Sequence, residues 1–264
     1  MFRAYWTFIA TVLLTLLYGI PALVLGFLFP AREVWAPFFH VWGWGILMAA
    51  GARLTVEGAD RLSENEHYFF IANHKSAIDI PIMAAALRGR ARFMVKHTLF
   101  RVPVLGWCMK MHGFVPIDRS SPRKAKQSID RMAARLDKRP ISLLVFAEGT
   151  RIDDDAIGPF KHGSMNVCQR TGMSVVPLAI VGSRDIHRAR ILRVNSGAVH
   201  VSIGRPIPAD EVARQTTAEL ARSTRDAVAL LYEDACSVLS TQHSAPSTQS
   251  SVLSPQSSRG QGET

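Results

Sequence analysis

The N-terminal stretch limits the folds open to this chain more than any other feature, because residues 4–29 carry no charged side chain. As one straight helix these 26 residues would be about 39 Å long, which exceeds the roughly 30 Å hydrocarbon core of a bilayer. Pro21 is expected to bend that helix. A second uncharged stretch, residues 34–52, is rich in tryptophan, which favours the membrane interface. We therefore predict a membrane-embedded helical segment over residues 1–52.

A secretory signal peptide is disfavoured for this segment, because its apolar core would be only about 7–15 residues long. Two spanning helices fit the length, and a hairpin that dips into one leaflet fits the internal proline and the tryptophans equally well. Both arrangements leave the rest of the chain on the same side of the membrane as the N-terminus. In either case the sequence predicts a membrane protein with a cytoplasmic body.

The chain has 31 basic and 21 acidic residues and a formal net charge of +10, which indicates an anionic partner. Nucleic acid, an anionic membrane surface and a phosphorylated substrate all meet that condition. Residues 80–117 contain no acidic residue, and six basic side chains are interspersed there with large apolar ones. This mixture suits a surface that rests on anionic lipid. Since no groove-reading or RNA-stacking motif accompanies the charge, we expect an anionic membrane surface as a partner and no nucleic acid.

Neither the cysteines nor the histidines have a spacing that indicates a metal site. Cys108, Cys168 and Cys236 are widely separated and form no C-x-x-C pair, which is typical of buried thiols in a reducing compartment. The nine histidines form no H-E-x-x-H or comparable set. We therefore expect no metal and no cofactor.

A histidine and an aspartate five residues apart, His74 and Asp79, follow an apolar run at residues 67–72 that predicts a buried strand. A neutral imidazole can take a proton from a hydroxyl near pH 7, and a carboxylate on its other nitrogen fixes the tautomer. Within one regular helix the two side chains would point about 140° apart. A turn from a loop into a helix, with Pro81 in its first turn, brings them together. The alternative is that Asp79 only caps the helix and His74 is an ordinary loop residue.

No protein nucleophile stands out beside this pair. Ser76 is nearby, but no Gly-x-Ser-x-Gly elbow occurs in the chain. The nucleophile is therefore expected to belong to the substrate. The alternatives are a serine hydrolase or thioesterase that uses Ser76, and a non-catalytic protein that binds membranes or nucleic acid.

Two further segments supply groups suited to a phosphate. Residues 141–146 predict a central strand, and the Glu-Gly-Thr-Arg block at residues 148–151 follows at its carboxyl end, where ligands gather in α/β sheets. The glycine allows close backbone approach, and the threonine and arginine supply donors. Upstream, residues 113–119 form a short apolar segment that ends at Arg119, whose guanidinium can hold a phosphate or pair with the neighbouring Asp118.

The remaining sequence predicts further elements and a tail. Beyond residue 240 the composition turns to Ser, Gln, Pro, Thr and Gly, which predicts disorder. The pattern predicts strands near residues 53–58, 174–180 and 198–203, and helices near residues 122–138, from residue 160 onward, and over residues 210–238.

Four blocks stand in order along the chain: His74 with Asp79, residues 114–119, residues 146–151 and residues 176–180. Together they resemble the four motifs of the glycerolipid acyltransferases, particularly the bacterial 1-acyl-sn-glycerol-3-phosphate acyltransferases. A single H-x4-D motif would be a weak signal, whereas the four blocks in this order are specific.

The resemblance covers about residues 53–208 and implies a fold. The expected fold class is α/β, a single mixed-sheet acyltransferase domain with flanking helices, preceded by an N-terminal membrane-embedded helical segment. The predicted parts are the membrane helices at 1–52, the catalytic domain at 53–239 and a disordered tail at 240–264.

The resemblance also implies roles for single residues. His74 would be the general base and Asp79 its partner. Lys96 matches a lysine that reaches the acceptor phosphate in relatives, and Arg119 and the Glu-Gly-Thr-Arg block match the acceptor site. The expected substrate-binding residues are Lys96, Arg119, Glu148, Gly149, Thr150 and Arg151.

The chain departs from the family pattern beside these positions. Lys75 stands where glutamine is common, Thr98 where an acidic residue is common, and Ala147 where proline is common. These departures leave the implied reaction class intact. Pro116, which stands where phenylalanine is common, lies two residues before Asp118 and leaves the identity of the acceptor open.

The implied reaction transfers an acyl group from acyl-CoA or acyl carrier protein to the free sn-2 hydroxyl of 1-acyl-glycerol-3-phosphate and forms phosphatidate. The acceptor oxygen is itself the nucleophile, so no acyl-enzyme is required, and the thioester is a co-substrate rather than a cofactor. Another lysophospholipid or a lyso-ornithine lipid is the alternative acceptor. The expected location is the inner (cytoplasmic) membrane, with the catalytic domain on the cytoplasmic side.

Overall fold

A seven-stranded sheet with the order β1-β7-β6-β2-β5-β3-β4 forms the centre of the protein. The computed structural model describes residues 2–29, 36–117, 123, 127–128, 130, 141–152, 154, 156–188 and 193–244. Strands β2 to β6 run parallel to one another, whereas β7 is antiparallel to β6 and pairs in parallel with β1. The strands are β1 (Ala52–Glu57), β2 (Tyr68–Ala72), β3 (Ala91–Lys96), β4 (Val115–Ile117), β5 (Ser142–Phe146), β6 (Ser174–Val181) and β7 (Gly197–Ile203).

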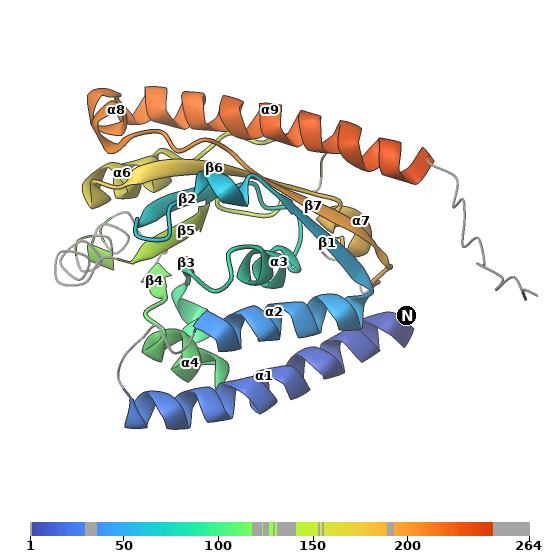
Figure 1. Ribbon diagram of the computed structural model, residues 1–264. Helices are drawn as coiled ribbons and strands as arrows, with labels where there is room; N and C mark the ends of the chain where they lie inside the picture. The colour runs from blue at the N-terminus through green and yellow to red at the C-terminus, as the bar shows by residue number, and fades with distance from the viewer. Residues whose placement is uncertain are drawn as a thin grey trace, which may run out of the picture.

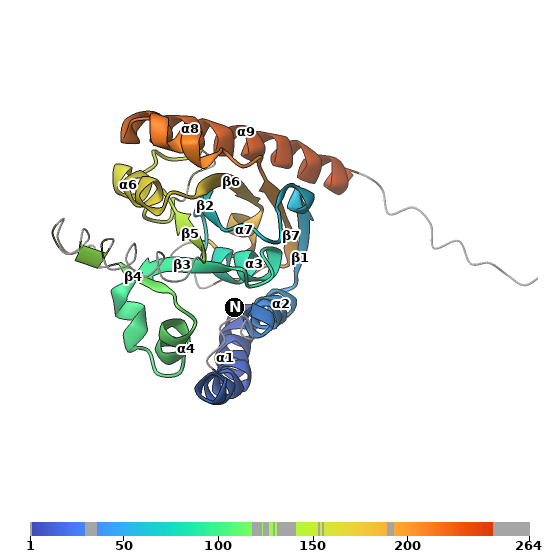
Figure 2. The same cartoon turned by 60° about the vertical axis from the view of Figure 1, so that its left-hand side comes forward.

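Helices cover both faces of this sheet (Figure 1). One face is covered by α6, α8 and α9, while α3 covers the other, with α2 outside α3 and α1 outermost. Turned by 60°, the molecule shows α4 beside α1 (Figure 2). The helices are α1 (Phe2–Leu28), α2 (Ala36–Ala50), α3 (Asp79–Ala86), α4 (Leu105–Met111), α6 (His162–Thr171), α7 (Ser183–Ile186), α8 (Ala209–Arg214) and α9 (Thr217–Ser244), with short 3-10 turns η2 (Ala59–Arg61) and η3 (His97–Arg101).

Strand β2 lies at the middle of the sheet, and every one of its residues is buried, as a central parallel strand requires. Phe69 and Ile71 belong to the core cluster shared with α6 and α9. Phe70 and Ala72, which point to the opposite face, belong to the cluster shared with α2 and α3. The predicted mixed α/β sheet with flanking helices is confirmed.

The segment predicted as one lipid-facing surface, residues 80–117, is divided in the structure. Its middle forms β3, which the sequence reading missed, and Phe93 and Met94 are buried in the core there. Only the part that follows β3 exposes large apolar side chains, namely Leu99, Val102 and Trp107. The interspersed charges break the apolar pattern that would predict this strand. The interior accommodates one of them, since Arg92 is buried and donates to the Gly89 carbonyl.

The predicted helix over residues 210–238 is two helices, α8 and α9. Thr216 begins the second one with a capping box, because Glu219 N–H donates to its hydroxyl and its own N–H donates to the Glu219 carboxylate. Helix α9 continues to Ser244, beyond the expected start of the tail. The three-part domain division stays a prediction, and most of the predicted helix over residues 122–138 lies outside the described residues.

The two N-terminal helices are joined closely to the body. Helix α2 packs on α3 through Gly43, where an added Cβ would lie 2.6 Å from the Pro81 carbonyl oxygen. Helix α1 lies along α2, and the Trp42 indole N–H donates to the Thr15 hydroxyl at 3.1 Å. The helices therefore form a layer on the domain instead of projecting from it.

Gly43→Ala is expected to push α2 away from α3 and to lower the free energy of unfolding by about 1–3 kcal/mol, as overpacking does. Gly163→Ala is the matched control, because Gly163 is also helical and nothing lies within 4 Å of its added Cβ. That control should leave stability unchanged or raise it by up to about 1 kcal/mol. Thermal unfolding in detergent micelles measures both, and equal melting temperatures for the two variants would refute the tight contact.

Candidate functional site

The candidate site lies where three neighbouring parallel strands end. In the sheet β2 lies between β5 and β6, with Ala72 opposite Phe146 on one side and Leu178 on the other. Loops that follow adjacent parallel strands meet at one edge of the sheet. The loop with His74 is therefore flanked by the segment after β5 and by the segment after β6.

His74 and Asp79 meet in the way that the predicted turn from loop to helix requires. His74 lies in the loop after β2, Asp79 is the first residue of α3, and His74 Nδ1 lies 2.8 Å from Asp79 Oδ2. The same carboxylate oxygen accepts the N–H groups of Lys75 at 2.8 Å and Ser76 at 2.9 Å. Because Asp79 is fully buried, this arrangement fixes the tautomer with the proton on Nδ1 and leaves Nε2 as an acceptor.

Two contacts from the β5 side fix the position of His74. Its ring stacks on Phe146 with 4.1 Å between centroids and 13° between planes. The carboxylate of Glu148 accepts the His74 N–H at 2.8 Å and the Gly158 N–H at 3.0 Å. Burial raises the pKa of Glu148, while these two bonds and the Lys75 charge oppose that rise. Glu148 thus binds two segments of backbone together.

Lys75 is a buried cation directly beside the pair, with 1% of its surface exposed. Its Nζ donates to the Asp154 carbonyl at 2.6 Å and to the Ala156 carbonyl. It also lies 5.6 Å from the centre of the Tyr232 ring on α9. The side chain at this departure from the family pattern therefore links the loop between β2 and α3 to the segment after β5 and to α9.

The other predicted site residues are distributed along the same edge. Gly149 adopts a positive φ of 74°, as the tight turn after β5 requires. Thr150 and Arg151 follow it and are exposed, and Lys96 is exposed at the end of β3. Arg119 lies outside the described residues. The roles assigned to these residues stay predictions.

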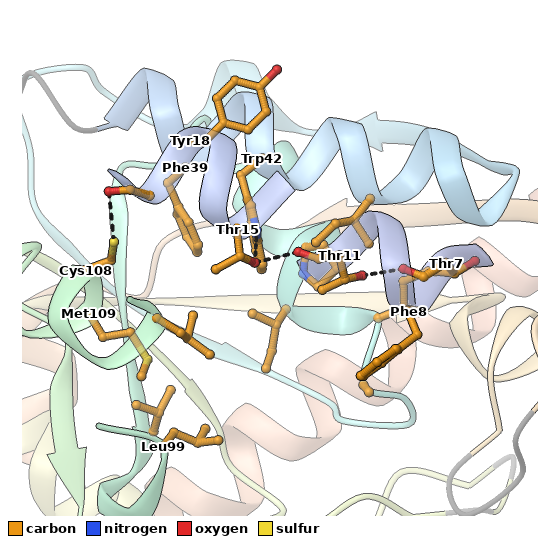
Figure 3. Close-up of a pocket in the computed structure, with 18 of the residues that line it drawn as sticks. Thr7, Phe8, Thr11, Thr15, Tyr18, Phe39, Trp42, Leu99, Cys108 and Met109 are labelled. Carbon is orange, nitrogen blue, oxygen red and sulfur yellow. Dashed lines mark hydrogen bonds between the residues drawn. The ribbon is translucent and has the colours of Figure 1, made fainter. Parts of the chain in front are cut away.

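A cavity of about 460 Å³ extends from this edge between the N-terminal helices and the body. Its walls come from α1, α2, α3, α4 and the strand and turn before α4, and most of its lining is apolar (Figure 3). Thr7, Thr11 and Thr15 also line it, and the hydroxyls of Thr11 and Thr15 donate to carbonyls one helical turn back. Arg151 and His187 belong to the lining, as do Ala77 and Ile78 of the loop between β2 and α3.

His187 is the site residue that sequence reasoning missed. It follows α7, and the Ser76 hydroxyl donates to its carbonyl oxygen at 2.5 Å. No motif marks this histidine. The available signal was its place in the loop after β6, since that strand is the neighbour of β2.

The chain is similar to known proteins. Residues 53–181 match a family model described as Acyltransferase. The chain is 32% identical over 176 residues to the chloroplastic 1-acyl-sn-glycerol-3-phosphate acyltransferase of Arabidopsis thaliana, which covers 65% of this chain and 49% of that relative. It is 34% identical over 154 residues to a chloroplastic protein of the same description from Brassica napus, with coverages of 58% and 44%. The chain thus spans about half the length of these curated relatives.

A solved structure shares the fold. It is the crystal structure of the 1-acyl-sn-glycerophosphate acyltransferase PlsC from Thermotoga maritima, with a TM-score of 0.78 and 22% sequence identity. The similarity covers 89% of this chain and 95% of that one.

Glu148→Ala is expected to lower the free energy of unfolding by about 2–4 kcal/mol, because it leaves two backbone N–H groups without their acceptor. Glu64→Ala is the control, since the Glu64 side chain is 80% exposed and pairs only at the surface with Arg90. That control should cost less than about 1 kcal/mol. Denaturant unfolding in micelles compares the two, and a Glu148 variant as stable as the control would contradict the proposed link.

Proposed function

Since this chain belongs to the acyltransferase family, we propose that it transfers an acyl group from a thioester to the hydroxyl of a lysophospholipid. One observation carries the proposal: the paired His74 and Asp79 belong to residues 73–79, the proposed catalytic loop, and Ala77 and Ile78 of this loop line an apolar cavity together with the basic side chain of Arg151. A base, a cation and an apolar cavity are what an amphiphilic phosphate acceptor needs.

In the proposed mechanism His74 Nε2 takes the proton from the acceptor hydroxyl while Asp79 stabilises the imidazolium. The hydroxyl oxygen attacks the thioester carbonyl, the carbon–oxygen bond forms, and the carbon–sulfur bond then breaks. The imidazolium gives its proton to the departing thiolate. No covalent enzyme intermediate is needed, so the chain does not have to supply a nucleophile.

The proposed acceptor is 1-acyl-glycerol-3-phosphate, which would become phosphatidate. Its phosphate would be held by Arg151 and Thr150, with Lys96 and Arg119 as further candidates, and its acyl chain suits the apolar cavity. Another lysophospholipid or a lyso-ornithine lipid is the alternative acceptor. The donor would be acyl-CoA or acyl carrier protein.

The alternative of a serine hydrolase is disfavoured by the contacts of Ser76. The Ser76 hydroxyl donates to the His187 carbonyl, and its backbone N–H donates to Asp79. In this arrangement the hydroxyl proton is donated to a backbone carbonyl, whereas a serine nucleophile would donate it to the base, His74 Nε2.

We propose that α1 and α2 embed in one leaflet instead of crossing the bilayer. Helix α1 is long and apolar enough to cross, but it lies along α2 and contacts α4. Helix α2 has 15 residues, about 22 Å, and is held against α3. The outer side of α1 exposes a row of large apolar residues, and Trp107 of the neighbouring α4 is also exposed. This continuous apolar layer suits the lipid side of a monotopic protein.

This arrangement would keep the active site where lipid acceptors partition. We propose the inner membrane as the location, with the catalytic domain on the cytoplasmic side, where soluble thioester donors are available. The net charge of +10 would favour an anionic lipid surface.

His74→Ala and Asp79→Ala are each expected to lower acyl transfer by at least about a hundredfold, because general base catalysis contributes that much. Membranes that contain each variant are incubated with a radiolabelled acyl donor and lysophosphatidate, and new phosphatidate is measured. Protein level, melting temperature and membrane attachment serve as controls. Robust turnover by the His74 variant would contradict the mechanism. Release of free fatty acid without an acceptor would favour the serine hydrolase.

Leu17→Asp is expected to weaken binding to lipid vesicles by about a hundredfold, since an aspartate in the apolar layer costs about 3 kcal/mol. Leu230→Asp on α9 is the matched control, because Leu17 and Leu230 are 61% and 62% exposed. Vesicle co-sedimentation measures both variants. Unchanged binding by the Leu17 variant, or equal loss by the two, would show that α1 does not face the lipid.

A further inference from the structure

The cavity lining contains a second histidine close to the catalytic loop, His187, that the mechanism above does not use. It comes from the segment after β6, whereas Arg151 comes from the segment after β5. These two strands flank β2, which leads to the base. The topology thus brings two basic side chains to the cavity from opposite sides of the catalytic loop.

We propose that His187 is an acceptor-binding residue that holds, together with Arg151, the phosphate of the acceptor. This inference rests on the proposed acyl transfer to a lysophospholipid and names a further residue of that same site. The cavity offers the apolar volume for a chain, and these two side chains offer the donors for its anionic headgroup.

The backbone of His187 is fixed without help from its ring. The Ser76 hydroxyl donates to the His187 carbonyl at 2.5 Å, whereas the distance from that hydroxyl to His187 Nδ1 is a long 3.4 Å. A hydroxyl has one proton to donate, and the carbonyl contact is much the shorter. The imidazole therefore lies beside the catalytic loop, while the backbone carbonyl of His187, and not the ring, makes the hydrogen bond to that loop.

The surroundings of His187 favour an anion between it and Arg151. Burial and the charge of Arg151 lower the pKa of His187, and the Asp79 carboxylate acts in the opposite direction. Arg184 and Asp185 of α7 precede it in the chain, and the exposed Arg188 follows it. A bound phosphate would offset both the burial and the repulsion from Arg151, so it would raise the pKa of His187 and draw a proton from solvent.

Another histidine in the lining, His112, differs from His187 in its position. Burial and the charge of Arg92 lower the pKa of His112 to about 4, so that imidazole is neutral near pH 7. His112 follows the end of α4, whereas the bond from Ser76 ties His187 to the catalytic loop. We therefore assign to His187 the phosphate binding that is coupled to the uptake of a proton.

The test compares His187→Gln with the wild-type chain and with His67→Gln, a control at an exposed histidine. At pH 6.5 the His187 variant is expected to raise KM for lysophosphatidate about tenfold, as loss of a charge-assisted hydrogen bond does, with kcat and the donor KM nearly unchanged. The Kd of a 2-deoxy lysophosphatidate, which binds but offers no hydroxyl, is measured from pH 6 to pH 8. The ratio of variant to wild-type Kd should be largest at pH 6 and fall toward one at pH 8.

The outcomes separate this inference from the function on which it rests. If the wild-type chain makes no phosphatidate, the proposed function fails. If it does, and the His187 variant keeps a wild-type KM and pH dependence, the inference alone is overturned. Should the variant unfold, NMR of 15N-histidine in the wild-type chain replaces it: the pKa of His187 must rise when the deoxy acceptor binds, and a constant pKa would reject the assignment.

Discussion

The site depends on one buried carboxylate. Asp79 receives three hydrogen bonds on a single oxygen, from the His74 ring and from the N–H groups of Lys75 and Ser76. A carboxylate without water is stable only when donors compensate its charge, so the loop must fold around it. The same bonds that neutralise Asp79 aim the imidazole and turn the chain from β2 into α3. The geometry of the proposed catalytic pair and the local fold therefore depend on the same set of hydrogen bonds.

The second constraint comes from the N-terminal helices, which have their polar groups on the protein side. Thr7, Thr11 and Thr15 lie along the cavity, while large apolar residues cover the outside of α1. This is the reverse of a soluble helix, which buries its apolar face. The arrangement makes α1 both the outer layer of the protein and one wall of its cavity. The proposed membrane attachment and the cavity shape consequently depend on the same helix.

The sequence predicted those parts of the site that depend on short-range order. The buried strand before His74, the turn that brings Asp79 to it, and the central strand before Glu148 all follow from local patterns, and the structure contains them. Strand β3 was missed because its charged residues broke the apolar pattern, although Arg92 finds a carbonyl partner in the interior. His187 was missed for a different reason: its position depends on the pairing of β6 with β2, which lies about a hundred residues away in the chain. Contacts at that range leave no local trace in a single sequence.

The buried Lys75 has a consequence for the order in which the protein is completed. Its contact with Tyr232 places part of α9, the last described helix, over the loop that carries His74. During synthesis the apolar α1 leaves the ribosome before α9 has been made. The environment of Lys75 is closed only when α9 docks, so under the proposed function a growing chain could meet lipid through α1 before the loop with His74 is completed. The proposed membrane attachment would then precede the proposed acyl transfer.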